Sequence, residues 1–200
     1  MKKLLRKRIV TVAVSLVAFI AVTVAVFSTR TAAFFSDNTR TGIQTINSGG
    51  LTIELRQATV LPGESTPVFT NDPIRITPGS TASKIVTVKN VGSFPAFVRV
   101  AVTPKIELSA EHAGATADTS LVGYNINTAA WTLYDGYYYC NQMLEAGEES
   151  APLFTDVTFD PKMDNLYTNS TITFHVNAHA VQVTGNGGSA LEAEHWPQEN

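Results

Sequence analysis

The chain has 200 residues, of which 44% are hydrophobic, with 14 Lys and Arg, 17 Asp and Glu, and one cysteine, Cys140. This length suits one domain with a sizeable core, and a lone cysteine excludes an internal disulfide. Six basic residues and no acid precede Phe34, so a chain released at that point carries 8 − 17 = −9 formal charges. Such a charge argues against nucleic acid as a partner.

Residues 1–33 have the pattern of an export signal. Five basic residues at the start are followed by an uncharged apolar run over 10–27, and Thr31 and Ala33 supply the small side chains that a signal peptidase requires. Cleavage after Ala33 releases a protein that begins at Phe34. The alternative is an uncleaved anchor, because this run is just long enough to span a bilayer. In both cases we expect the bulk of the protein to be secreted or held at the cell surface, with the membrane contacted only through an uncleaved signal segment.

The N-terminal segment of the released chain, residues 34–49, is a possible donor strand for subunit contact. Two aromatic residues, Phe34 and Phe35, lie at its tip, and Ile43 and Ile46 follow after a polar stretch. An isolated strand of this kind is not stable in water. The segment therefore pairs with its own sheet, adds to a sheet edge of a neighbouring subunit, or stays disordered.

Residues 50–184 show strand patterns throughout, with period-two alternation, β-branched residues and Pro-Gly or Asp-Gly turns. Asp135-Gly136 predicts a tight hairpin turn between two short strands. We therefore expect an all-β protein, a single antiparallel β-sandwich of jelly-roll type after the N-terminal signal helix. The predicted strands are 51–55, 83–89, 96–102, 131–134, 137–141, 153–159 and 170–183.

Two stretches lack such a pattern. Residues 108–127 are rich in Ala, Gly and Thr without a clear period, which indicates a long loop or an insertion at one end of the sandwich. The C-terminal tail, residues 185–200, begins with a glycine cluster. Within it, 191–196 is expected to form a helical turn or a closing strand, and the remainder to be frayed.

Five segments in this order resemble the TasA and camelysin (CalY) family of exported proteins. The resemblance covers nearly the whole chain, although the turn chemistry of each single motif is ordinary. The segments are Thr31–Asp37, Ile46–Ile53, Val88–Val100, Asp135–Asn141 (together with Leu144–Glu148 and Leu153–Phe154) and Ala180–Gln182.

The resemblance implies export by a Gram-positive bacterium and cleavage by a dedicated SipW-type signal peptidase. It also implies two rival functions. Members similar to TasA form biofilm-matrix filaments in which the N-terminal segment of one subunit completes the sheet of the next. Camelysin is described as a surface metallopeptidase.

The residues do not favour a zinc peptidase. The sequence has no His-Glu-x-x-His motif, which would place two histidine ligands and a general base on one helix. The nearest pair, His175 and His179, falls in a predicted strand, where four residues span about 13 Å, too far to share one ion. We expect both to face solvent.

The cysteine and the aromatic residues of the predicted hairpin have ordinary structural explanations. Cys140 follows Tyr137–Tyr139 in a strand and is expected to be a small buried residue rather than a nucleophile. Alternation of the three tyrosines predicts that at least one is exposed, where it could mark a subunit contact, although a core position is the commoner role. Trp131 is expected in the core.

These observations favour a structural role. We expect no catalytic residue, cofactor or metal, and we expect self-association or binding to other matrix proteins. The alternatives are a camelysin-type secreted metallopeptidase and a monomeric surface binding protein.

Overall fold

A computed structural model of the protein describes residues 42–48 and 51–197. The described residues form twelve β-strands and three single turns of 3₁₀ helix, so the all-β expectation is confirmed. The predicted signal peptide, the predicted cleavage residues Thr31, Ala33 and Phe34, and the neighbouring Phe35 lie outside the described residues. The 3₁₀ turns are η1 (Ala110–His112), η2 (Thr119–Leu121) and η3 (Asn165–Tyr167).

The first sheet is organised around β2 (Leu51–Val60). On one edge of β2, β1 (Ile43–Ser48) pairs with its first half and β3 (Pro67–Phe69) with its last three residues. On the opposite edge, β6 (Ile85–Asn90) pairs antiparallel with β2. Side chains along β2 alternate between buried and half-buried as far as residue 57, which is the period-two pattern that the sequence predicts.

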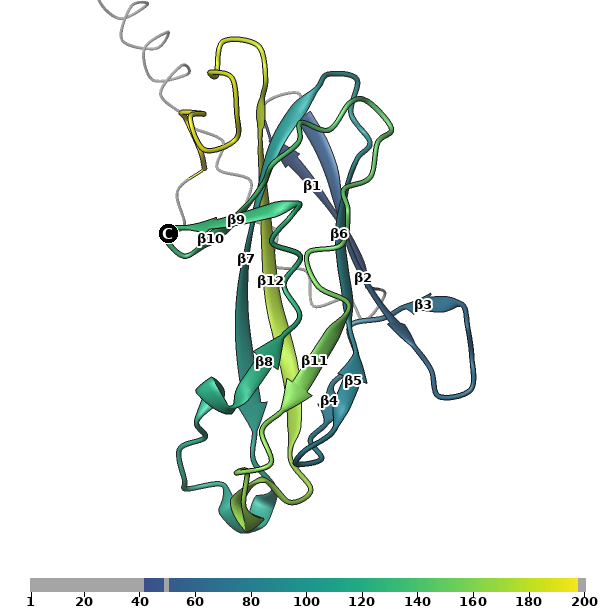
Figure 1. Ribbon diagram of the computed structural model, residues 1–200, viewed down its shortest axis with the longest axis vertical. Coiled ribbons are helices and arrows are strands. Elements are labelled where there is room, and N and C mark those ends of the chain that lie inside the picture. The colour runs from purple at the N-terminus through teal and green to yellow at the C-terminus, as the bar shows by residue number, and fades with distance from the viewer. Residues whose placement is uncertain (1–41, 49–50, 198–200) are drawn as a thin grey trace, which may run out of the picture. The chain divides into compact units, whose positions relative to one another are not determined.

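The second sheet has the strand order β4-β12-β7-β10-β9. Its centre is an antiparallel pair, β7 (Ala96–Glu107) and β12 (Thr171–Gln182), which are aligned along all twelve residues. The edge strands are β4 (Ile74–Arg75) and β9 (Trp131–Tyr134), and β10 (Tyr137–Cys140) lies beside β7. This arrangement is visible in Figure 1, where β7 and β12 run side by side.

The predicted β9–β10 hairpin is confirmed. Tyr134 pairs with Tyr137 across a two-residue turn. Both turn residues have positive φ, 47° for Asp135 and 79° for Gly136. A turn of this type matches the twist of the two strands, and Asp-Gly is one of the few pairs that adopts it without strain.

The third sheet joins β5 (Thr81–Ser83), β11 (Asp156–Phe159) and β8 (Val122–Tyr124). It adjoins the first sheet, because only Lys84 separates β5 from β6. Residues 144–155, the crossing segment, bond to β6 and then continue into β11, which pairs with β5. Along this segment the Ser150 amide donates to the Val88 carbonyl, and the Lys84 amide donates to the Thr155 carbonyl, at 2.8 and 2.9 Å.

The crossing segment corrects one predicted strand. Only the last four residues of 153–159 form β11. Leu153 and Phe154 still bond to the backbone of Val86, but they do not form a regular ladder. Both side chains are apolar and buried, 0% and 1% exposed. This apolar composition is the reason why the sequence pattern predicted a strand here. The predicted loop 108–127 likewise ends in a short strand, β8.

One hydrophobic core takes side chains from all three sheets. On β12 the predicted inward row is confirmed, with Phe174 1% exposed, whereas His175 and Asn177 on the other face are exposed. Tyr124, Phe154 and Phe174 lie at the centre of this core, with ring centroids 5.2 to 6.5 Å apart. The inward row of β12 comprises Ile172, Phe174, Val176, Ala178 and Ala180.

Removing the hydroxyl of Tyr124 should not destabilise the protein at neutral pH. The hydroxyl oxygen is buried and has no hydrogen-bond partner among the described residues. Tyr124→Phe should therefore leave the free energy of unfolding unchanged or raise it by about 1 kcal/mol. Urea unfolding at neutral pH measures this, and a clear loss of stability would contradict it.

As the pH rises above about 10, Tyr124→Phe should lose less stability than the parent protein does. Burial raises the pKa of Tyr124 to about 12, with Tyr138 adding to the effect. An unfolded tyrosine ionises near pH 10 and the buried one only near pH 12, so this hydroxyl costs the folded state no stability below about pH 10 and an increasing amount as the pH rises toward 12. Unfolding near pH 11 should therefore separate the parent from Tyr124→Phe.

Candidate assembly surface

The first strand belongs to its own sheet. β1 pairs with β2 of the same chain from Ile43 opposite Arg56 to Ser48 opposite Leu51. Ile43 and Ile46, proposed together as contact residues, lie on opposite faces of this strand because they are an odd number of positions apart. Ile46 packs against the core and Ile43 is exposed. The rest of the predicted donor segment before Gly42, residues 34–41 with Phe34 and Phe35, lies outside the described residues.

Gly42 fixes the point at which that segment enters the sheet. Its φ of 65° lies in the left-handed region that favours glycine. It lies where β1 and β3 meet along β2, and its carbonyl accepts a hydrogen bond from the Gln57 amide. A Cβ at this position would overlap the Thr70 amide nitrogen and the Gln57 carbonyl oxygen. Sequence analysis did not single out this residue, because the sequence does not show which backbones converge on it.

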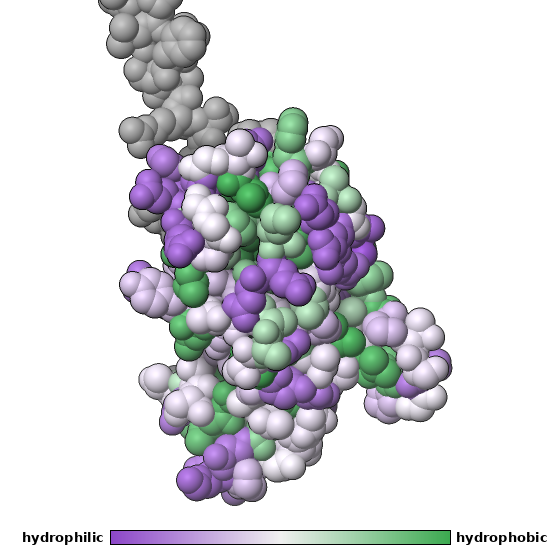
Figure 2. Space-filling view, turned by 45° about the horizontal axis from the view of Figure 1, so that its top comes forward, coloured by the Kyte–Doolittle hydropathy of each residue, from purple (hydrophilic) through white to green (hydrophobic). Residues whose placement is uncertain are grey.

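A hairpin arm extends from the first sheet. It consists of the end of β2, residues 61–66 and β3, and in Figure 1 it leaves the body of the sheets on the right. Figure 2 shows hydrophobic residues on this projection. Leu61, Val68 and Phe69 are its exposed apolar side chains. Pro67 begins β3 and offers no amide hydrogen, which weakens this edge as a template for strand addition.

The edge of the second sheet is the more apolar surface. β9 pairs with β10 and with no other strand of the described chain. Its Leu133 and Tyr134 are 59% and 64% exposed, the highest values among the large hydrophobic side chains that the structure describes. β9 contains no proline and no charged residue. Apart from its short length of four residues, this edge lacks the proline and charged side chains that natural proteins use against strand addition.

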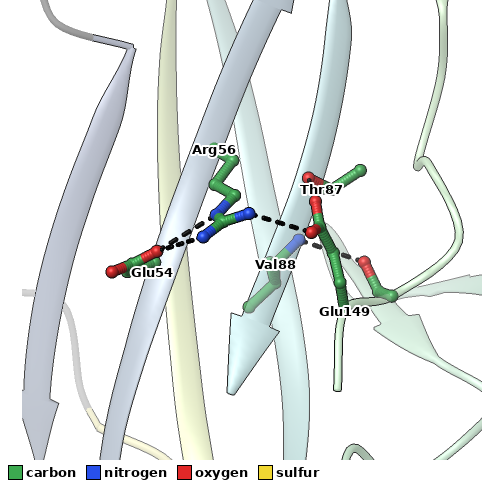
Figure 3. Close-up of polar contacts among 6 residues, drawn as sticks. Glu54, Arg56, Thr87, Val88 and Glu149 are labelled. Atoms are coloured by element: carbon green, nitrogen blue, oxygen red, sulfur yellow. Dashed lines mark hydrogen bonds and ion pairs between the residues drawn. The ribbon is translucent and has the colours of Figure 1, made fainter. Parts of the chain in front are cut away.

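The outer face of the first sheet carries an ion-pair network (Figure 3). Arg56 contacts Glu54 at 2.7 Å and Glu149 at 3.0 Å, and Thr87 donates to Glu149 at 2.6 Å. The hydrogen bond to Glu54 raises the pKa of the Arg56 guanidinium. Glu149 belongs to the crossing segment, and the network therefore fastens that segment to β2 and β6.

A second cluster, on the outer face of the second sheet, surrounds Arg99 of β7. This residue is only 8% exposed. Its guanidinium carbon lies 3.9 Å from the centre of the Tyr137 ring and 4.8 Å from the Trp196 ring. The guanidinium also donates to the Pro197 carbonyl at 3.0 Å. Cation–π contacts and a carbonyl acceptor thus hold the C-terminal segment against the sheet.

This cluster corrects two sequence expectations. The described part of the tail is not frayed, because Ala190 and Ala193 are buried against Phe97 and Val181. The tail forms neither a closing strand nor a helix, but irregular turns. None of the three consecutive tyrosines is fully exposed: Tyr139 is buried, and the other two are half-buried. The tail covers this face, which the sequence pattern could not reveal.

Trp196→Ala should lower the free energy of unfolding by about 1–3 kcal/mol, because it removes both a ring contact with Arg99 and apolar cover from Tyr139. Trp196→Phe should keep part of this stabilisation. Urea unfolding monitored by circular dichroism measures both, and Glu194→Ala, an exposed change two residues away, is the control. If Trp196→Ala and the control were equally stable, the tail would have no stabilising role.

The candidate metal ligands are not assembled into a site. His175 is exposed and His179 half-buried on the outward face of β12, where His179 accepts a hydrogen bond from Arg99. Within residues 42–48 and 51–197, no three His, Cys, Asp or Glu side chains come close enough together to hold a metal ion. Cys140 is 3% exposed in the core, as expected for a small buried residue, and burial raises the pKa of its thiol.

A shallow pocket of about 380 Å³ lies at the ends of β5, β8 and β11. Its lining consists mainly of glycines and hydroxyl side chains, and Asp160 is the only titratable residue in it. Asp160 accepts a hydrogen bond from the Lys162 amide at 2.8 Å. The pocket lining thus does not offer the pair of acid and base groups that hydrolysis commonly uses.

Comparisons of the chain with models of known protein families, with curated proteins and with solved structures found no match. In the part of the chain that the structure describes, no helix is both long and apolar enough to cross a bilayer. The apolar run 10–27 lies outside that part.

Proposed function

We propose that the protein is an exported structural protein of the bacterial cell surface or biofilm matrix, which polymerises by donor-strand addition. The observation that carries this proposal is the exposed apolar edge at β9, with Leu133 and Tyr134 on the terminal strand of a sheet. The donor is the segment before Gly42 of another copy. Its two phenylalanines would cover apolar side chains that water otherwise contacts.

The energetics are adequate for such an assembly. Burying each phenylalanine contributes roughly 1.5–3 kcal/mol. Backbone hydrogen bonds along the β9 edge would add direction and register. A donor of eight residues, 34–41, is as long as or longer than the four-residue strand that would receive it. Several such contacts can offset the repulsion between subunits of charge −9.

The finer architecture belongs to the same proposal. The first and third sheets would form one layer, joined through β5 and β6, and the second sheet the other layer, with the common core between them. We assign this arrangement to a jelly-roll-type β-sandwich. Export would use residues 1–33 as a signal, with a SipW-type peptidase cutting between Ala33 and Phe34.

The test is electron microscopy of the purified chain that begins at Phe34, beside a casein-degradation assay with and without chelator. Filaments without proteolysis would support the proposal. Proteolysis that a chelator abolishes, and that a change of His175 or His179 removes, would instead support a metallopeptidase. A monodisperse protein without either property would indicate a surface binding protein.

A further inference from the structure

A lysine lies in the apolar row that β5 and β6 direct toward the core. Ala82, Val86 and Val88 of this row all pack in the main cluster. Lys84 has the same parity and is 2% exposed, less than many core side chains. A fully buried lysine without an ion-pair partner is rare, since burial costs its charged form a large hydration energy.

The amine of Lys84 has one polar partner. Its Nζ donates to Oδ1 of Asn71 at 3.0 Å. No carboxylate among the described residues lies within ion-pair distance of it. Asn71 belongs to the short connection that leads from the arm to β4, and it is half-buried.

The lowered pKa of the Lys84 amine also favours its action as a nucleophile. Burial lowers its pKa to about 8, with the charge of Asp72 opposing part of the shift. At neutral pH roughly one amine in ten is therefore uncharged, compared with about one in three thousand for an ordinary lysine. Desolvation of this kind is a recognised way to activate a lysine.

The electrophile, the side-chain amide carbon of Asn71, is close to the amine. A carbonyl bond is about 1.2 Å long, so an amine 3.0 Å from Oδ1 lies roughly 3.8 Å from the Asn71 Cγ. That is slightly beyond the separation of a near-attack geometry, and a small side-chain rotation would close it. Both groups belong to one chain, so the encounter is intramolecular. Burial also restricts the motion of the Lys84 side chain.

We propose that Lys84 and Asn71 form an intramolecular isopeptide bond. The neutral Nζ attacks Cγ of Asn71, and a new Cγ–Nζ amide bond forms as the Cγ–Nδ2 bond breaks. One Nζ proton passes to Nδ2, which leaves as ammonia. Asp72, next to Asn71 in the chain, is the carboxylate whose charge acts on this amine. Neither oxidant nor cofactor is consumed.

The bond would give this chain a covalent clip in place of the disulfide that a lone cysteine excludes. It would close a ring between positions 13 residues apart and anchor the base of the arm to the β5–β6 strand. A ring of this kind restricts the unfolded chain in the same way as a disulfide. Unlike a disulfide, it does not depend on the redox state of the surroundings.

Peptide mapping of the full chain, purified in folded form, tests the proposal directly. Trypsin cleaves after Arg56, Arg75, Lys84 and Lys89 in an unmodified chain, giving free peptides 57–75 and 76–84. An isopeptide bond blocks cleavage at Lys84 and joins 57–75 to 76–89. The branched product should have a mass about 17 Da below the sum of its two parts, because ammonia has left.

Recovery of free 57–75 and 76–84 from the folded protein, with no branched product, would overturn the proposal. Asn71→Ala keeps the lysine and should restore cleavage at Lys84; a branched peptide in that variant would show that the partner is wrong. Lys84→Met should also abolish the branch, and Lys89→Met, in the neighbouring strand β6, should leave the branch in place. Because the decisive measurement is made on the unchanged sequence, it does not depend on whether a variant folds.

Discussion

A chain that begins at Gly42 should remain monomeric under conditions in which the chain that begins at Phe34 sediments as large assemblies. The shorter chain lacks Phe34, Phe35 and the rest of the proposed donor but keeps β1 and its complete pairing with β2. The difference should be nearly all-or-none, because each lost phenylalanine removes roughly 1.5–3 kcal/mol from every subunit contact.

A chain that starts at Gly42 separates the effect on assembly from any effect on the fold. A chain shortened to residue 49 would lose β1 and with it the contact of Ile46 with the core. Loss of assembly would then be indistinguishable from loss of the fold. Circular dichroism should give the same strand content for both chains, and equal assembly of both would remove the donor-strand proposal.

Two further measurements identify the strand edge that accepts the donor and test the electrostatic repulsion between subunits. Leu133→Lys places a charge on the β9 edge and should abolish assembly, whereas Val68→Lys on the arm should not; the reverse result would assign the arm as the acceptor. Assembly of the parent should increase with ionic strength, since salt screens the repulsion between chains of charge −9. Analytical ultracentrifugation at low and high salt measures both effects.

Phe174→Ala should lower the free energy of unfolding by about 3–5 kcal/mol. The side chain is 1% exposed at the fourth position of β12, in the longest strand pair, and lies beside Tyr124 and Phe154, with centroids 5.9 and 6.5 Å away. Truncation would leave a cavity between sheets that are fixed by continuous ladders and cannot move together to fill it. Urea unfolding of the chain beginning at Gly42 avoids interference from assembly.

The matched control is Phe94→Ala. That phenylalanine is 55% exposed in the turn between β6 and β7, and its loss should change the free energy of unfolding by less than about 0.5 kcal/mol. If both variants were equally stable, the aromatic centre would not be the part of the core that holds the sheets together.

Much of the strand content could be predicted because alternation is a local property. The inward row of β12 and the Asp135-Gly136 hairpin each depend on neighbouring residues and on a period of two. The prediction was wrong for 153–155 because buried apolar residues in an irregular crossing segment have the same composition as a strand. It was wrong for the described tail because only contact with Phe97 and Val181 orders Ala190 and Ala193.

Some of the proposed contact residues could likewise be selected from the sequence, and others could not. Phe34 and Phe35 are recognisable from sequence as apolar residues near a predicted cleavage point, and their role stays a prediction. The exposed pair Leu133 and Tyr134 could not be selected, because an edge strand and a central strand have similar sequences. Only strand order identifies β9 as terminal.

The sequence by itself determined the all-β character, the turn positions and the faces of the long strands, since these follow from side-chain alternation and backbone preference within a few residues. Tertiary structure alone decided which strands are edges, why position 42 requires glycine, and that the Lys84 amine meets the Asn71 amide. Each of these depends on segments brought together across the fold, where packing and desolvation, rather than local propensity, set the environment of a side chain.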